Sequence, residues 1–110
     1  MYKFALPVKD GYEFFFLSEL IYFQAKGNYS LAIIENRKAA DVFISLKKLE
    51  SQLAPRGFIR IHHEYLINSY HMIKYNKGVG GIVELSNGKK LEVSRGRKRE
   101  FLRRIKGKRR

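Results

Sequence analysis

Residues 20–34 have the sequence Leu20-Ile21-Tyr22-Phe23-Gln24-Ala25-Lys26-Gly27-Asn28-Tyr29-Ser30-Leu31-Ala32-Ile33-Ile34, and this stretch decides the fold. Its two apolar runs, 20–25 and 29–34, are rich in aromatic and β-branched residues, which is typical of strands. The residues between the runs, 26–28, favour a turn. The stretch therefore predicts two neighbouring antiparallel strands.

Strand-like runs continue on both sides of this predicted hairpin. A short aromatic run, residues 14–17, precedes it, and the polar residues 35–38 connect it to another run at 39–44. These segments follow one another through short connections that contain turn-forming residues. We therefore expect an antiparallel meander.

Later runs of the same kind predict further strands at 58–61, 65–67, 82–85 and 91–93. The last two are joined by Ser86-Asn87-Gly88-Lys89, and Asn-Gly between apolar runs is a strong hairpin signal. The fold class is therefore expected to be mainly β.

Two short helices interrupt the predicted strands. Ser45 is a good N-cap for an amphipathic helix at about 45–53, whose leucines recur at i, i+3 and i+7. The apolar residues 101, 102 and 105 indicate a short C-terminal helix. We expect a basic C-terminal tail at about 103–110.

Length and composition indicate a single domain over residues 1–110. One hundred and ten residues that are 45% hydrophobic suffice for one core. The absence of cysteine excludes disulfides, thiol catalysis and cysteine-ligated zinc. No apolar run approaches the roughly 18 residues of a membrane span, so we expect a cytoplasmic protein without a membrane partner.

The chain is strongly basic, with 23 Lys and Arg against 10 Asp and Glu and a net charge of +13. Much of the excess lies in residues 95–110, which hold seven Arg and three Lys against one Glu. This distribution favours an anionic partner, and nucleic acid over an acidic membrane or an acidic protein. A solubilising basic segment is the alternative interpretation.

Residues 59–65 contain His62-His63-Glu64, a group that could bind a metal or act in acid–base chemistry. Adjacent residues of an extended segment point to opposite sides, and the histidines lack the i, i+4 spacing of a helical metal site. We therefore expect no metal and no cofactor. Beside Arg60, the histidines could instead donate hydrogen bonds to a phosphate or to a base edge.

Two further polar segments could contact nucleic acid. In Arg95-Gly96-Arg97-Lys98-Arg99, arginine offers a planar fork of donors to guanine or phosphate, and Gly96 allows a close approach or a positive φ. Lys26-Gly27-Asn28-Tyr29 offers polar side chains, but taken alone it is more typical of an ordinary turn. We find no P-loop, no G-x-S-x-G and no dinucleotide-binding fingerprint, and we expect no enzyme.

Together, four ordered segments resemble the LytTR family of bacterial DNA-binding domains, which forms the effector domain of many response regulators and also occurs alone. The resemblance covers nearly the whole chain. The segments are Ile21-Tyr22-Phe23-Gln24-Ala25-x-Gly27-Asn28-Tyr29-Ser30, Ser45-Leu46-Lys47-Lys48-Leu49-Glu50, Phe58-Ile59-Arg60-Ile61-His62 continuing to Tyr65-Leu66-Ile67-Asn68, and Val93-Ser94-Arg95.

The resemblance implies an elongated, β-sandwich-like fold of small antiparallel sheets whose loops enter successive major grooves of bent double-stranded DNA. It implies sequence-specific binding for transcription regulation within a two-component system, without catalysis. The DNA contacts that it implies fall on Asn28, Tyr29, Arg60, His62, His63, Arg95, Gly96, Arg97 and Lys98. The family usually has Arg-Ser or a similar pair after the first histidine, so His63-Glu64 implies an altered target preference.

Among these contacts, we expect Arg95 to read a base, because it follows a predicted strand. We expect Arg97 and Lys98, which lie beyond a flexible Gly96, to anchor the DNA backbone. The partners that the resemblance implies are double-stranded DNA, a second copy on repeated half-sites, and an N-terminal receiver domain or a separate sensor kinase.

Two functions of other classes remain as alternatives. A basic RNA-binding or ribosome-associated domain would share the charge but usually needs exposed aromatic platforms, whereas the aromatic residues here lie mostly within apolar runs. A small hydrolase that uses histidine and glutamate would bind zinc and gain stability from it.

Overall fold

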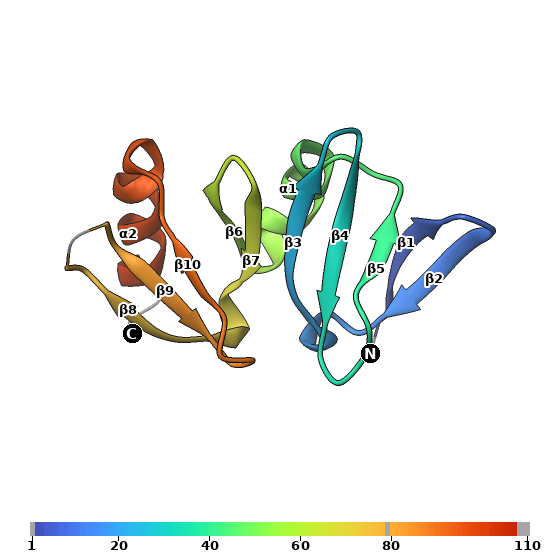
Figure 1. Cartoon of the computed structure of the whole chain (residues 1–110), viewed down its shortest axis with the longest axis horizontal. Helices are drawn as coiled ribbons and strands as arrows, with labels where there is room; N and C mark the ends of the chain where they lie inside the picture. Colours follow the sequence, from blue (N-terminus) through green and yellow to red (C-terminus); the bar gives the residue numbers. More distant parts are fainter. Residues whose placement is uncertain (1, 79, 108–110) are drawn as a thin grey trace.

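The computed structural model describes residues 2–78 and 80–107, which form mainly strands in three antiparallel sheets (Figure 1). The strands are β1 Phe4–Val8, β2 Gly11–Phe15, β3 Leu20–Lys26, β4 Tyr29–Ile34, β5 Ala40–Val42, β6 Phe58–His62, β7 Tyr65–Asn68, β8 Met72–Asn76, β9 Ile82–Leu85 and β10 Lys90–Glu92. The helices are α1 Leu46–Leu53 and α2 Lys98–Gly107, with short 3-10 turns η1 Leu17–Glu19, η2 Ala54–Arg56, η3 Ser69–His71 and η4 Arg95–Arg97. The expected mainly β fold with two short helices is confirmed.

The central sheet has five strands in the order β5-β4-β3-β7-β6. The predicted hairpin is its centre, with Lys26 paired to Tyr29 across β3 and β4. The expected meander is present for β3, β4 and β5. The chain then passes through α1 to the other edge of the sheet, where β6 pairs with β7 and β7 pairs with β3.

The expectation that residues 14–17 join this meander is wrong. β2 ends at Phe15 and pairs with β1 in a separate two-stranded sheet, and Leu17 begins η1. Phe15 is buried and Phe14 is exposed, because successive side chains of a strand point to opposite faces and one face of this hairpin is covered. The main-chain N–H of Phe43 donates to the main-chain oxygen of Pro7 (2.8 Å), which holds the hairpin beside β5.

Both faces of the five-stranded sheet are buried. On one face, Phe23 of β3 packs in a core with Leu49 of α1 and with the β1–β2 hairpin. On the other face, Ile67 of β7 packs in a second core with Val83 of the three-stranded sheet and Phe101 of α2. This double burial explains why residues 20–23 are consecutively apolar and buried instead of alternating with polar residues.

The third sheet has the order β10-β9-β8. As expected, β9 and β10 are joined by a turn through Asn87-Gly88, where Gly88 has φ 87° and its N–H donates to the main-chain oxygen of Leu85 (2.8 Å). A positive φ at this position favours glycine, so the sequence signal and the geometry agree.

The helix predicted at about 45–53 is confirmed as α1, and the Oγ of Ser45 accepts a hydrogen bond from the main-chain N–H of Lys48 (3.2 Å). α2 is fixed by Arg104, which donates to the main-chain oxygens of Phe58 and Ala54 (2.9 Å each). Residues 103–107, which the sequence assigned to a basic tail, continue α2, and residues 108–110 of that tail lie outside the described residues. Neither α1 nor α2 has the length and apolar character that a membrane span requires.

A buried histidine joins parts of the chain that are distant in sequence. His71 lies in η3 with 3% of its surface exposed. Its Nε2 donates to the main-chain oxygen of Ser18 (2.6 Å), and its Nδ1 lies 2.6 Å from the Oγ of Ser86. The imidazole therefore connects η1, which precedes the central sheet, to the β9–β10 turn.

Candidate nucleic-acid interface

Three connections lie in a row along one edge of the molecule, at the top in Figure 1. They are the β3–β4 turn, the β6–β7 turn and the segment that joins β10 to α2. The residues predicted to contact DNA lie in these connections or directly beside them. Distant stretches of sequence are therefore brought to a single edge.

Main-chain hydrogen bonds fix these connections relative to one another. The N–H of Ala25, near the end of β3, donates to the oxygen of Glu64 in the β6–β7 turn (2.9 Å). The N–H of Ser94, just before η4, donates to the oxygen of Ile61 at the end of β6 (2.8 Å). The middle connection is thus bonded to the segments that lead to both of its neighbours.

The β3–β4 turn consists of Gly27 and Asn28. Gly27 has φ 75°, and a positive φ at the first position of a two-residue turn matches the twist of the flanking strands. Asn28 is exposed at the tip. Tyr29 is half-buried, and its ring packs on that of Phe43 with centroids 5.8 Å apart, so it offers less free surface than Asn28.

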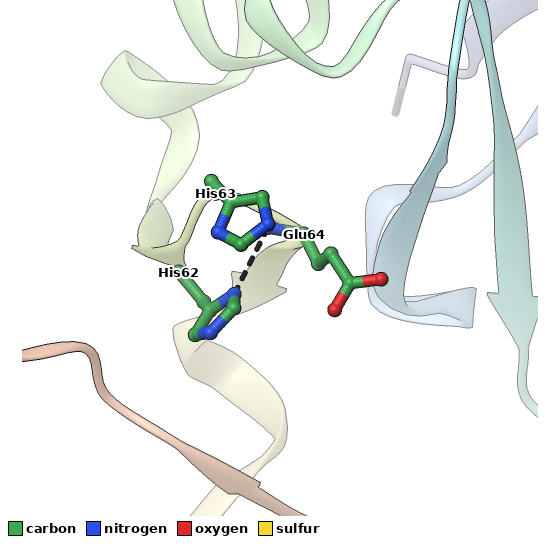
Figure 2. Close-up of side chains that lie close together, drawn as sticks. All are labelled: His62, His63 and Glu64. Carbon is green, nitrogen blue, oxygen red and sulfur yellow. Dashed lines mark hydrogen bonds between the residues drawn. The ribbon is translucent and has the colours of Figure 1, made fainter.

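The β6–β7 turn brings the two adjacent histidines side by side. Their ring centroids are 4.5 Å apart and their planes differ by 31°, so the expectation that they point to opposite sides is wrong (Figure 2). The alternation fails because a register shift between Arg60 and His62 and the tight turn at 63–64 interrupt the extended backbone. His62 is half-buried and His63 is exposed.

The main-chain N–H of Glu64 donates to Nδ1 of His62 (3.1 Å), as the dashed line in Figure 2 marks. Because a main-chain N–H can only donate, this Nδ1 is an acceptor, and a neutral His62 carries its proton on Nε2. His62 therefore has a hydrogen-bond donor available at Nε2.

Possible ligand atoms of His62, His63 and Glu64 all lie within 4.8 Å of one another, the one such group among the described residues. The histidine rings are tilted by 31° relative to each other, and the Glu64 carboxylate extends away from them (Figure 2). A metal on Nδ1 of His62 would also displace the hydrogen bond from Glu64. The group is also one protein donor short of the four that a structural zinc site uses.

The guanidinium of Arg60 is engaged within the protein. Its Nε and Nη2 donate to the main-chain oxygens of His62 (2.8 Å) and His63 (2.6 Å), and its Nη1 donates to Oε1 of Glu50 on α1 (2.9 Å). Its side chain is 13% exposed. The sequence predicted Arg60 as a DNA contact, but each of its three nitrogens already has a protein partner.

Arg95 is exposed at the start of η4, whereas Arg97 and Lys98 are half-buried. Gly96 does not take the positive φ that glycine allows, since it lies inside a 3-10 turn in which Arg97 N–H donates to the oxygen of Ser94 (3.0 Å). No other atom lies within 4 Å of where a Cβ on Gly96 would project, so its surface is open to a close approach.

The helix that follows this turn bears an exposed ion pair. Arg103 donates to both carboxylate oxygens of Glu100 (2.9 and 2.6 Å). The hydrogen bonds from Arg103, aided by its charge and that of Arg104, hold the pKa of Glu100 below its ordinary value. Glu100 is thus ionised at neutral pH and offsets one of the positive charges of α2.

Sequence reasoning did not single out Lys48 and Tyr12. They line an open hollow that also includes Asn28 and Phe43. For Lys48, the sequence does show two consecutive lysines, Lys47-Lys48, in the first turn of α1, and this local positive charge could have indicated a binding residue. Tyr12 gave no signal, because its place beside Asn28 depends on how the β1–β2 hairpin packs.

The chain is similar in sequence to a known family and in structure to a solved domain. The model of the LytTr DNA-binding domain family matches residues 10–106. Among solved structures, the chain is similar to a LytTr DNA-binding domain from Bacillus cereus, described as that of a methyl-accepting/DNA response regulator. The TM-score is 0.80 at 21% identity, over 96% of this chain and 97% of the other. Curated protein sequences gave no match.

Proposed function

The chain belongs to the LytTr DNA-binding domain family, and from that membership we propose that it binds double-stranded DNA sequence-specifically through the three connections on one edge. DNA binding and transcription regulation are the general properties of this family. The proposal adds which side chains make the contacts and how they lie on the duplex.

The row of connections along the longest axis carries this proposal (Figure 1). The molecule extends 43 Å along this axis. One turn of B-DNA rises about 34 Å, so a molecule of this length can lie along one face of a duplex with the row of connections turned towards its grooves. The hydrogen bonds between the connections keep their spacing fixed, which reading two grooves in register requires.

Each connection offers side chains suited to DNA. Asn28 can bond adenine through its amide, and Arg95 can bond guanine O6 and N7 with its planar fork. The donor on Nε2 of His62 and the exposed ring of His63 suit acceptors of a base edge or a phosphate. Gly96 permits a close approach of the backbone, and Arg97 and Lys98 supply charge for phosphates. Tyr29 supports the first turn by packing on Phe43.

Regulation by such a domain needs a second input besides DNA. We propose a second copy bound to a repeated half-site, since two copies on successive half-sites double the contacts with DNA. We further propose control by a receiver domain or by a separate sensor kinase. The solved domain from Bacillus cereus, described as part of a response regulator, supports this proposal.

Selection of bound sequences from random duplex DNA tests the proposed function. Enrichment of one motif, repeated at a spacing near 10 or 11 base pairs, is the expected result. Binding without any enriched motif would contradict sequence-specific recognition and leave only general affinity for polyanions.

One observation favours the RNA-binding alternative. Of the 15 aromatic residues, five are buried, five are half-buried and five are exposed, so the expectation that they lie mostly in the core holds in part. The exposed Tyr12 and Phe14 lie on the same face of β2, as two stacked bases would require. Competition between duplex DNA and single-stranded RNA separates the two functions, since stacking on this pair would favour the single strand.

A further inference from the structure

We propose that Arg60 is a positioning residue, which holds the His62-His63 turn in its DNA-reading shape and links this turn to α1 through Glu50. This inference rests on the proposed function, because it concerns the shape of the same edge. It assigns Arg60 a role different from the phosphate or base contact that its charge suggests.

The contacts of Arg60 follow the shape of the turn. Two of its nitrogens donate to the consecutive main-chain oxygens of His62 (2.8 Å) and His63 (2.6 Å). A planar guanidinium with fixed donor directions suits a pair of neighbouring acceptors. These two bonds therefore hold the peptide groups from which both imidazoles extend.

The turn needs such a support. Two-residue hairpin turns favour a positive φ at their central residues, and neither His63 nor Glu64 has one. The pairing of β6 with β7 is also shifted between Arg60 and His62, which removes regular ladder bonds at this place. The guanidinium supplies donors to two consecutive carbonyls of this irregular turn.

The third nitrogen extends the support to another element. Nη1 of Arg60 donates to Oε1 of Glu50 on α1 (2.9 Å). α1 is buried through its leucines in the first core, so Glu50 is held by an element that is itself fixed. The carboxylate also offsets the charge of Arg60, which weakens any attraction of this arginine to phosphate.

Arg60→Lys separates positioning from charge, because lysine keeps the positive charge but lacks the planar fork. We expect the preference for the selected duplex over a scrambled one to fall about ten-fold, on the scale of one lost base contact. We expect the slope of log K against log[salt] to stay unchanged, because no phosphate contact is lost. Stacking of the two imidazoles should also weaken, which the ring proton shifts in NMR spectra report.

Arg37→Lys is the matched control. Arg37 follows β4 at the opposite edge and forms an ion pair with Glu13 of β2. It is thus another arginine paired with a glutamate of a different element, and the substitution again conserves charge. We expect the site preference of Arg37→Lys to equal that of the unmodified protein.

Glu50→Ala provides a second variant that removes only the link to α1. The Glu50 side chain is 37% exposed, so the fold should tolerate its truncation even if Arg60→Lys does not fold. We expect a loss of site preference in the same direction as for Arg60→Lys, but smaller. Circular dichroism and thermal melting establish the folded fraction in each case.

The outcomes distinguish the two proposals. If the unmodified protein shows no preferred duplex, the proposed function fails before Arg60 is tested. If it shows one and folded Arg60→Lys and Glu50→Ala retain it in full, the positioning role is overturned. A salt slope reduced by about one unit in Arg60→Ala would likewise overturn it, since this is the signature of a phosphate contact.

Discussion

The main-chain N–H of Ser94 donates to the main-chain oxygen of Ile61 (2.8 Å), and this bond joins the start of η4 to the strand that ends in the histidine turn. Arg95 follows directly and is exposed. Its backbone therefore begins from a fixed point, whereas its side chain is free to meet a ligand. Base recognition by a long side chain requires this combination.

Arg95→Lys should flatten the preference at one base position of the target. A bidentate arginine–guanine contact contributes about 1–3 kcal/mol of discrimination, and lysine cannot reproduce its two parallel bonds. Most of the affinity for a scrambled duplex should remain, because the charge is kept. Binding measured against the selected duplex and its single-base variants checks this, and undiminished preference at every position would refute base reading by Arg95.

Arg97→Ala and Lys98→Ala serve as the comparison. Both residues belong to the ordered η4–α2 junction, so their order does not distinguish them from Arg95. They differ from Arg95 in exposure, since Arg97 and Lys98 are half-buried and Arg95 is exposed. Each substitution should weaken binding to all duplexes alike and reduce the salt slope by about one unit.

Affinity for duplex DNA should fall steeply with salt. If about five to seven phosphates are neutralised, log K against log[salt] should have a slope of about −4.5 to −6. Fluorescence anisotropy with a labelled duplex across a salt series measures it. A nearly flat response, or heparin binding as tightly as the selected duplex, would argue against the proposed interface.

Leu49→Ala should destabilise the fold without changing DNA preference. Leu49 is fully buried in the first core, so truncation should lower the free energy of unfolding by about 2–4 kcal/mol. Urea unfolding measures this, with the exposed Ser51→Ala on the same helix as a control expected within about 0.5 kcal/mol of the unmodified protein. A loss of site preference in folded Leu49→Ala would show that α1 contributes to DNA binding directly.

His71→Phe should lower the free energy of unfolding by about 1–3 kcal/mol. The ring would still fill its site, but the main-chain oxygen of Ser18 would lose the donor that the buried imidazole supplies. His63→Phe is the control, because His63 is exposed and its replacement should change stability by less than about 0.5 kcal/mol. Equal stability of the two variants would mean that the His71 hydrogen bonds contribute nothing net.

Zinc should leave the melting temperature unchanged. The group His62, His63 and Glu64 is one protein donor short of the four of a structural zinc site, and Nδ1 of His62 already accepts a hydrogen bond from Glu64, so we expect no binding energy from a metal (Figure 2). Differential scanning fluorimetry with and without zinc measures this. A rise with zinc that His63→Ala abolishes would establish a metal site and reopen the hydrolase interpretation.

The sequence predicts the central strands and α1 well, because their signals are local. Residues 20–34 combine strong strand propensity with turn formers, and Ser45 caps a clear apolar stripe. β1 and β8 were not predicted. β1 contains Pro7, which has no N–H to donate, and β8 contains the exposed Ile73, so neither shows a clean alternation.

The three candidate contact segments could be found from residue types, but their geometry could not. The stacking of His62 and His63 depends on the register shift in β6, which has no glycine or proline to signal it. The engagement of Arg60 depends on Glu50, ten residues away on a different element. Long-range packing decides whether an arginine is free to bind a ligand.

The five-stranded sheet belongs to both cores, and this should slow the hydrogen exchange of its central strand. β3 contributes side chains to both cores, so opening one core uncovers one face of this strand while the other core still covers the opposite face. Amide protons of β3 should therefore exchange only through global unfolding, as in the most protected segments of small domains. The spacing of the DNA-facing connections would then persist until the whole domain unfolds, and bending needed for a close fit would fall on the DNA.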